Sequence, residues 1–183
     1  MQLYNANIIN LLEIHIRRHT LSGHNSNQLS LQVLKKFRII YGSVRQHFRE
    51  VERTCGVTGS QLWIMQEIAD TSGIGVSELA TRLSIHQSTC SQLVEKLVTS
   101  KLIIKKRSKE DQRRVGLWLS EEAIKLIKRA PSPTEGVLPK ALRNLPTETI
   151  QALDSVMEQV IEQLQITDEG HAEKPLSDIF RST

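Results

Sequence analysis

The stretch that most constrains the fold lies between Val76 and Ser120. Apolar residues at helical spacing fill 77–84 and 86–102, which predicts two helices joined by a tight turn. After Lys101 the pattern changes, and 102–104 and 115–119 have the composition of short strands around the polar loop KKRSKEDQRR. That loop is too polar to be buried. We therefore expect an all-α chain with a small, solvated β-hairpin.

Positive charge is concentrated in the same stretch. Residues 86–114 hold eight Lys or Arg against three Asp or Glu, a net charge of +5, whereas the whole chain carries +4. The remainder is therefore close to neutral. A run of charge alone is usually only a solvated loop. Beside a helix pair, however, this concentration is the electrostatic pattern of a surface that binds a phosphate backbone.

The helix pair has the plan of a helix-turn-helix, and the hairpin that of a wing. The second helix suits the major groove, where its outward side chains reach base edges, and wing cations lie beside the groove. Asp111 is expected to hold Arg113 or a neighbour extended through a charged hydrogen bond. The predicted DNA-binding residues are Gln87, Ser88, Thr89, Ser91, Gln92, Lys96, Lys105, Arg107, Lys109, Arg113 and Arg114.

Two long helices with apolar residues spaced alternately by three and four flank this unit. Such seams pack lengthwise against another helix, and one winged core is too small to cover both. The sequence therefore predicts a homodimer. The predicted interface residues are Leu34, Phe37, Tyr41, Ile150, Leu153, Met157, Val160 and Leu164.

The chain divides into five predicted parts. Residues 1–29 are a partly helical N-terminal extension with a linker at 21–28, and 30–57 form a dimerisation helix. The winged core spans 58–120, the C-terminal dimerisation helices span 121–166, and 167–183 form a loose tail, of which one turn could dock. Apolar runs fall far short of the ~18 residues that span a bilayer, and the N-terminus lacks a signal-peptide pattern. We expect a cytoplasmic protein without a membrane partner.

The segment SELATRLSIHQSTCSQLVEKLVTSKLIIKKRSKEDQRRVGLWLS resembles the MarR family of transcriptional regulators, as do residues 30–165 more broadly. Asp111 and Arg113 match the family's Asp-x-Arg pair, Leu119-Ser120 its Leu-Thr, and 88–91 its Ser-Thr-Val-Ser. The resemblance implies a winged-helix homodimer that binds pseudo-palindromic duplex DNA, usually as a repressor. It leaves release by a small ligand or by cysteine oxidation open. Lys101 replaces the usual Gly, so it must adopt a positive φ or change the turn.

Other candidate sites have simpler explanations. Cys90 lies on an apolar stripe and Cys55 at a helix C-terminus, which favour packing over redox chemistry, although Arg53 beside Cys55 opposes this. His15, His19 and His24 lack a fixed third ligand, so we expect no metal and no cofactor. A ligand cavity of the kind the family has could be lined by Tyr41, His47, Trp63 and Met65. These residues are equally well explained as core.

The sequence fits two other function classes, an enzyme and a protein-binding module, less well than DNA binding. An enzyme is disfavoured because the sequence has no Gly-rich phosphate loop, metal triad or nucleophile elbow. The alternative to DNA binding is a protein-binding module whose basic wing meets an acidic partner. Duplex affinity that falls steeply with the logarithm of salt concentration would favour DNA.

Overall fold

The computed structural model describes residues 2–107, 115–165 and 170–179, with side chains from residue 26 onward in those ranges. The chain divides into two units, residues 1–42 and 43–183. The first is the N-terminal part of helix α1 (Gln2–Cys55), and the second begins with the last turns of the same helix. Among the described residues, no helix is both long and apolar enough to cross a bilayer.

Helix α1 is continuous where the sequence predicts two helices and a linker at 21–28. The linker prediction is wrong because extending a helix adds a hydrogen bond for each residue fixed, whereas Gly23 costs only about 1 kcal/mol relative to Ala. Ser30 Oγ donates to the Ser26 carbonyl at 2.9 Å, so the helix accommodates its polar residues. Gly56 then leaves α1 with a φ of +69°, a left-handed conformation that Gly adopts without steric cost.

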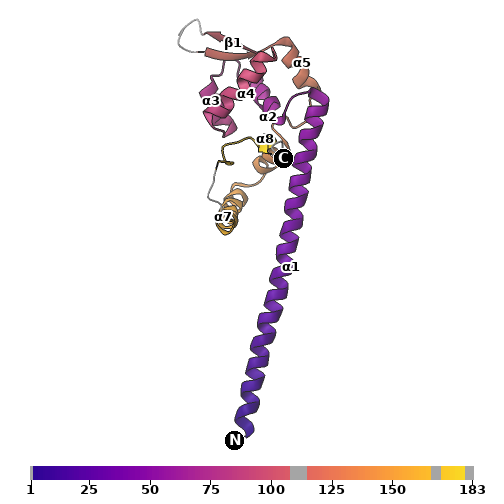
Figure 1. Cartoon of the computed structure of the whole chain (residues 1–183), viewed down its shortest axis with the longest axis vertical. Coiled ribbons are helices and arrows are strands. Elements are labelled where there is room, and N and C mark those ends of the chain that lie inside the picture. Colours follow the sequence, from indigo (N-terminus) through magenta and orange to yellow (C-terminus); the bar gives the residue numbers. More distant parts are fainter. Residues whose placement is uncertain (1, 108–114, 166–169, 180–183) are drawn as a thin grey trace. The chain divides into compact units, whose positions relative to one another are not determined.

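The second unit contains the predicted winged helix-turn-helix (Figure 1). Its elements are α2 (Gly59–Asp70), α3 (Val76–Leu83), α4 (Gln87–Thr99), β1 (Ile103–Arg107), β2 (Val115–Leu119) and α5 (Glu121–Arg129). The antiparallel hairpin pairs Ile103 with Leu119 and Arg107 with Val115. The fold class predicted from sequence is therefore confirmed.

One core joins these elements to the end of α1. Its largest fully buried side chains are Val51, Leu62, Ile64, Met65, Ile68, Leu79, Cys90, Val94, Leu97 and Leu117. Within α2, Ile64 is buried and Ala69 is exposed, because apolar residues occur on more than one side of this helix.

Side chains at helix starts fix where the core helices begin. Thr58 and Gln61 form a reciprocal capping box at α2, in which each side chain bonds the other's backbone N–H. Ser120 Oγ accepts from Ala123 N at the start of α5. Both helices therefore start at residues that the sequence indicates.

Three further helices follow in the second unit: α6 (Val137–Arg143), α7 (Thr147–Gln163) and α8 (Leu176–Ile179). Pro146, rather than Thr147, precedes the first residue of α7, and no side chain caps this helix. Thr147, a residue type that often caps helices, is instead the first residue of α7, because Pro, with its fixed φ, can start a helix without a side-chain bond. No residue of α7 is buried, whereas α8 buries Ser177.

The hairpin is attached to the core by its backbone. Gly73 N donates to the Leu117 carbonyl at 2.8 Å, and Leu117 N donates to the Ile74 carbonyl at 3.0 Å. A Cβ at Gly116 would lie 2.7 Å from the Gly73 carbonyl oxygen and 2.6 Å from the Trp118 ring. Only Gly fits there, so this position sets how closely the wing approaches the loop before α3.

Candidate nucleic-acid interface

Helix α4 has one buried side and one exposed side. Cys90, Leu93, Val94 and Leu97 are buried against the core. Of the predicted DNA-binding residues on this helix, Gln87, Ser88, Gln92 and Lys96 are exposed, and Thr89 and Ser91 are partly buried. The structure thus presents all six on or near the surface side of the helix, with hydrogen-bonding groups available to a groove.

The turn between α3 and α4 is held by local geometry. Ser84 ends α3 in the left-handed region with a φ of 53°, and Ile85 N donates to the Ala80 carbonyl at 3.1 Å. His86 then caps α4, because its side chain accepts from Ser88 N at 3.2 Å. This capping role was not predicted from the sequence, although His86 is a polar residue immediately before the apolar stripe of α4, which is where a cap is expected.

The described part of the wing carries three consecutive cations on β1, whose side chains alternate between the two faces of the hairpin. Lys105 forms an ion pair with Glu95 of α4, which links the wing to that helix. Lys106 Nζ lies 5.7 Å from the centre of the Trp118 ring, within the range of a cation–π contact. Arg107, at the end of β1, is exposed. The site therefore carries positive charge next to the exposed side of α4.

Four predicted wing residues lie outside the described residues: Lys109, Asp111, Arg113 and Arg114. Their roles, including the support that Asp111 would give to Arg113, stay predictions.

Lys101 lies at the turn between α4 and the wing, where the family usually has Gly. It adopts a φ of 59°, so the chain keeps the left-handed turn between α4 and the wing with a non-Gly residue. Lys101 N donates to the Val98 carbonyl at 2.9 Å, and Leu102 N donates to the Leu97 carbonyl at 2.9 Å. These two bonds close α4 and direct the chain into β1.

Both thiols are buried. Cys90 has no exposed surface, and burial raises its pKa to about 11. Burial also raises the pKa of Cys55, with Arg129 acting in the opposite direction. Arg53, which the sequence places beside Cys55, bonds Glu50 instead. A thiol kept protonated and covered is a poor nucleophile, so the packing interpretation of both cysteines is supported.

Metal-binding side chains do not gather in the described part of the chain, where no group of three or more His, Cys, Asp or Glu could hold an ion. The side chains of His15, His19 and His24 lie outside the described residues.

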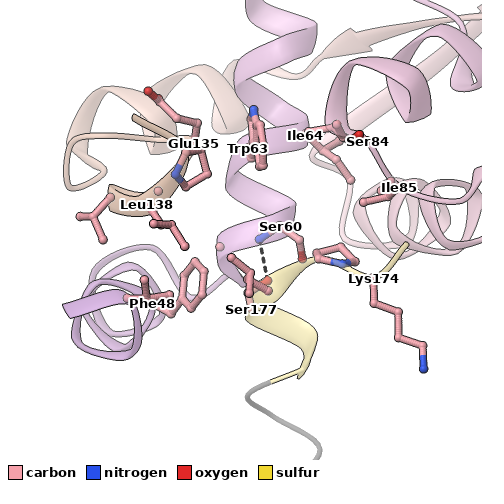
Figure 2. Close-up of a pocket in the computed structure, with 18 residues that line it drawn as sticks. Phe48, Ser60, Trp63, Ile64, Ser84, Ile85, Glu135, Leu138, Lys174 and Ser177 are labelled. Atoms are coloured by element: carbon pink, nitrogen blue, oxygen red, sulfur yellow. Dashed lines mark hydrogen bonds between the residues drawn. The ribbon is translucent and has the colours of Figure 1, made fainter. Parts of the chain in front are cut away.

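A cavity of about 170 Å³ lies beneath the helix-turn-helix (Figure 2). Phe48 of α1, Trp63 of α2, Ile85 of the turn and Leu138 of α6 contribute its apolar wall. Trp63 was a sequence candidate for this role. His47 and Met65 are buried but do not line the cavity, and Tyr41 belongs to the other unit.

The predicted dimer residues are apolar and incompletely covered. Leu34, Phe37 and Tyr41 of the first unit are exposed. In α7, Val160 and Leu164 are exposed, and Ile150, Leu153 and Met157 are partly buried. Each set leaves an exposed apolar surface within its own unit.

Comparisons with known proteins agree with this geometry. Residues 56–114, from the end of α1 into the wing, match the model of the MarR family. The HTH-type transcriptional repressor MdtR of Bacillus subtilis (strain 168) is 22% identical over 98 residues, which are 54% of this chain and 63% of MdtR. The match thus spans less than two thirds of that relative.

Solved structures support the fold. A MepR-like protein complexed with pseudoligands is similar with a TM-score of 0.51 and 16% identity, over 70% of this chain and 91% of its own. The MepR–DNA complex of S. aureus has a TM-score of 0.50 and 20% identity, over 70% of this chain and 93% of its own.

Proposed function

We propose that this chain is a duplex-DNA-binding transcriptional regulator of the MarR type, because its residues 56–114 match the model of that family. The observation that carries the proposal is the pairing of an exposed α4 face with a basic wing. Gln87, Gln92 and Lys96 offer groups for base edges or phosphates, and Lys105 and Arg107 supply charge beside them. The function is one of binding rather than catalysis, and we place it in the cytoplasm.

We further propose that the protein acts as a homodimer on a pseudo-palindromic operator. The apolar residues of α7 and of the first unit support a dimer. Two recognition helices related by a two-fold axis read half-sites about one DNA turn apart, ~34–36 Å. A repressor role is the proposal most in line with the relatives, because MdtR is described as a repressor and MepR was solved with DNA.

For release from DNA, the buried thiols argue against oxidation as the signal. The apolar cavity beside the α3–α4 turn supports a small apolar ligand instead. We assign no identity to such a ligand.

The proposal is tested by selecting bound duplexes from a random pool, first with the unsubstituted protein. Ser91→Ala and Gln92→Ala should change the preferred sequence, because each lost base contact is worth ~1–3 kcal/mol. Gln151→Ala removes the same kind of side chain from the exposed surface of α7 and should leave the preference unchanged. A pool that shows no enrichment with the unsubstituted protein would reject sequence-specific binding. Identical preferences for all three variants would remove Ser91 and Gln92 from the reading face.

In the wing, Arg113→Ala should weaken binding to all duplexes and make the salt dependence shallower by ~1 unit, as expected for a lost phosphate contact. An unchanged slope would remove Arg113 from the phosphate contacts.

A further inference from the structure

The C-terminal segment of the chain makes contacts that neither the winged helix nor the dimer requires. We define the C-terminal clasp as residues 171–178, which include the start of α8. The clasp bonds two places that are far apart in the sequence, the start of α2 and the start of α4. It is also part of the wall of the cavity.

At α2, the clasp completes the cap of the helix. Ser60 N is one of the first amides of α2, which have no partner inside the helix. It donates to Ser177 Oγ at 3.1 Å (Figure 2). Ser60 Oγ donates to Asp178 Oδ1 at 3.0 Å. Ser177 is only 4% exposed, so water does not readily replace this acceptor. The clasp is therefore anchored at this end through buried hydrogen bonds.

At α4, the clasp contacts the residue that starts the recognition helix. His86 N donates to the Glu173 carbonyl at 3.2 Å, and the His86 side chain in turn accepts from Ser88 N. The first residues of a recognition helix are those that reach base edges in helix-turn-helix proteins. The clasp thus bonds the end of α4 at which base reading begins.

Between these anchors, the clasp and the α3–α4 turn face the same cavity. Pro175 and Leu176 of the clasp line it, as do Ser84 and Ile85 of the turn. Figure 2 shows the Lys174 side chain directed away from the cavity, so the clasp presents mainly apolar groups there. A shift of the clasp would therefore alter both the cavity wall and the support of His86.

We propose that the C-terminal clasp is a positioning element that holds the start of the recognition helix in the orientation needed for specific DNA binding. Its anchor is the Ser60–Ser177 bond, and its point of action is the bond from His86 to Glu173. The inference rests on the proposed function, because specific binding is what the positioning serves.

The test uses three substitutions in the full chain that leave the negative and Lys/Arg charges unaltered. Ser177→Ala removes the acceptor oxygen, and Ser177→Val also adds bulk at a side chain that is only 4% exposed. His171→Ala, at an exposed position of the same segment, is the control. Amide hydrogen exchange is measured by NMR for Ser60 and His86, and affinity is measured for a duplex selected by the unsubstituted protein.

We expect exchange at His86 to accelerate by about tenfold or more in Ser177→Val and less in Ser177→Ala, with no change in His171→Ala. Specific affinity should fall in the same order by about tenfold at most, while non-specific affinity and the salt slope stay unchanged because phosphate contacts are intact. Faster exchange confined to Ser60 would mean that the clasp only caps α2 and would overturn the proposal. Unchanged or tighter specific binding, despite faster exchange at His86, would also overturn it.

The two hypotheses fail in different ways. If the unsubstituted protein selects no duplex, the proposed function fails and the DNA role of the clasp with it. If the unsubstituted protein selects a duplex, but the Ser177 variants match His171→Ala in His86 exchange and in specific affinity, the clasp proposal fails and the proposed function stands.

Discussion

At the scale of single residues, Gly116 has the least freedom to change. Its missing side chain lets the wing approach the Gly73 carbonyl, and an added Cβ would meet backbone at 2.7 Å. Sequence reasoning placed Gly116 in a strand without seeing this contact, because the partner is a loop more than forty positions earlier. Lys101 shows the opposite case, since its departure from Gly was visible in the sequence and the structure gives it the positive φ.

Gly116→Ala is expected to destabilise the fold by about 1–3 kcal/mol, because neither Gly73 nor the Trp118 ring can withdraw without disturbing the core. Gly42→Ala, where nothing lies within 4 Å of the added atom, should be neutral or stabilising by up to ~1 kcal/mol. Urea unfolding of both variants checks this. Equal changes in the free energy of unfolding for the two variants would show that the close approach at Gly116 does not affect stability.

Cys90 gives a pH dependence whose sign follows from burial. The pKa of Cys90 is about 11 in the folded protein, above its value near 9 in the unfolded chain. The contribution of the thiol to the free energy of unfolding is therefore complete below pH 9 and is lost as pH rises toward 11. Each pKa unit corresponds to ~1.4 kcal/mol. The stability advantage over Cys90→Ala should therefore shrink by about 1–2 kcal/mol between pH 8 and pH 10.5 in urea unfolding. A difference that stays constant over this range would contradict the buried, protonated thiol.

At the scale of elements, the winged helix was predictable because its signals are local. The apolar stripes of α3 and α4, the caps at Thr58 and Ser120, and the change of period after Lys101 each depend on neighbouring residues. The linker at 21–28 failed because a long helix overrides weak local preferences. The C-terminal clasp was not predictable in its contacts, since hydrogen bonds across more than a hundred residues leave no pattern in one sequence.

The ion pair between Lys105 of β1 and Glu95 of α4 sets how much of the wing's charge is available. Glu95→Gln should free Lys105, tighten duplex binding and steepen the salt dependence by up to ~1 unit. Glu122→Gln makes the same change of charge at the start of α5 and should affect binding less. Titrations at several salt concentrations compare them. If the two variants behave alike, only net charge matters and the local pair does not.

At the scale of the whole molecule, the apolar residues left uncovered on α7 require an explanation. Leu164 is 61% exposed and Val160 38% exposed, and both continue the spacing of the predicted seam. Leu164→Asp should change the stability of the single subunit by no more than ~0.5 kcal/mol, as is usual at exposed positions, but should convert a dimer to monomers.

Gln159→Asp is the matched control for Leu164→Asp, because at 100° per residue it lies away from the seam of α7. Sedimentation equilibrium at micromolar concentration should find a dimer for the unsubstituted protein and for Gln159→Asp. A monomeric unsubstituted protein would exclude the proposed dimer, and a dimeric Leu164→Asp would exclude this part of α7 from its interface.

The central claim is that the exposed face of α4 and the adjoining basic wing bind the phosphate backbone and bases of duplex DNA. The most direct measurement is the affinity of the purified protein for a selected duplex and for a random duplex, as a function of salt concentration. We predict that the logarithm of affinity falls linearly with the logarithm of salt for both, with a slope of about −0.9 for each phosphate contacted, and that the selected duplex binds more tightly throughout. Absence of binding to any duplex at low salt would contradict the account.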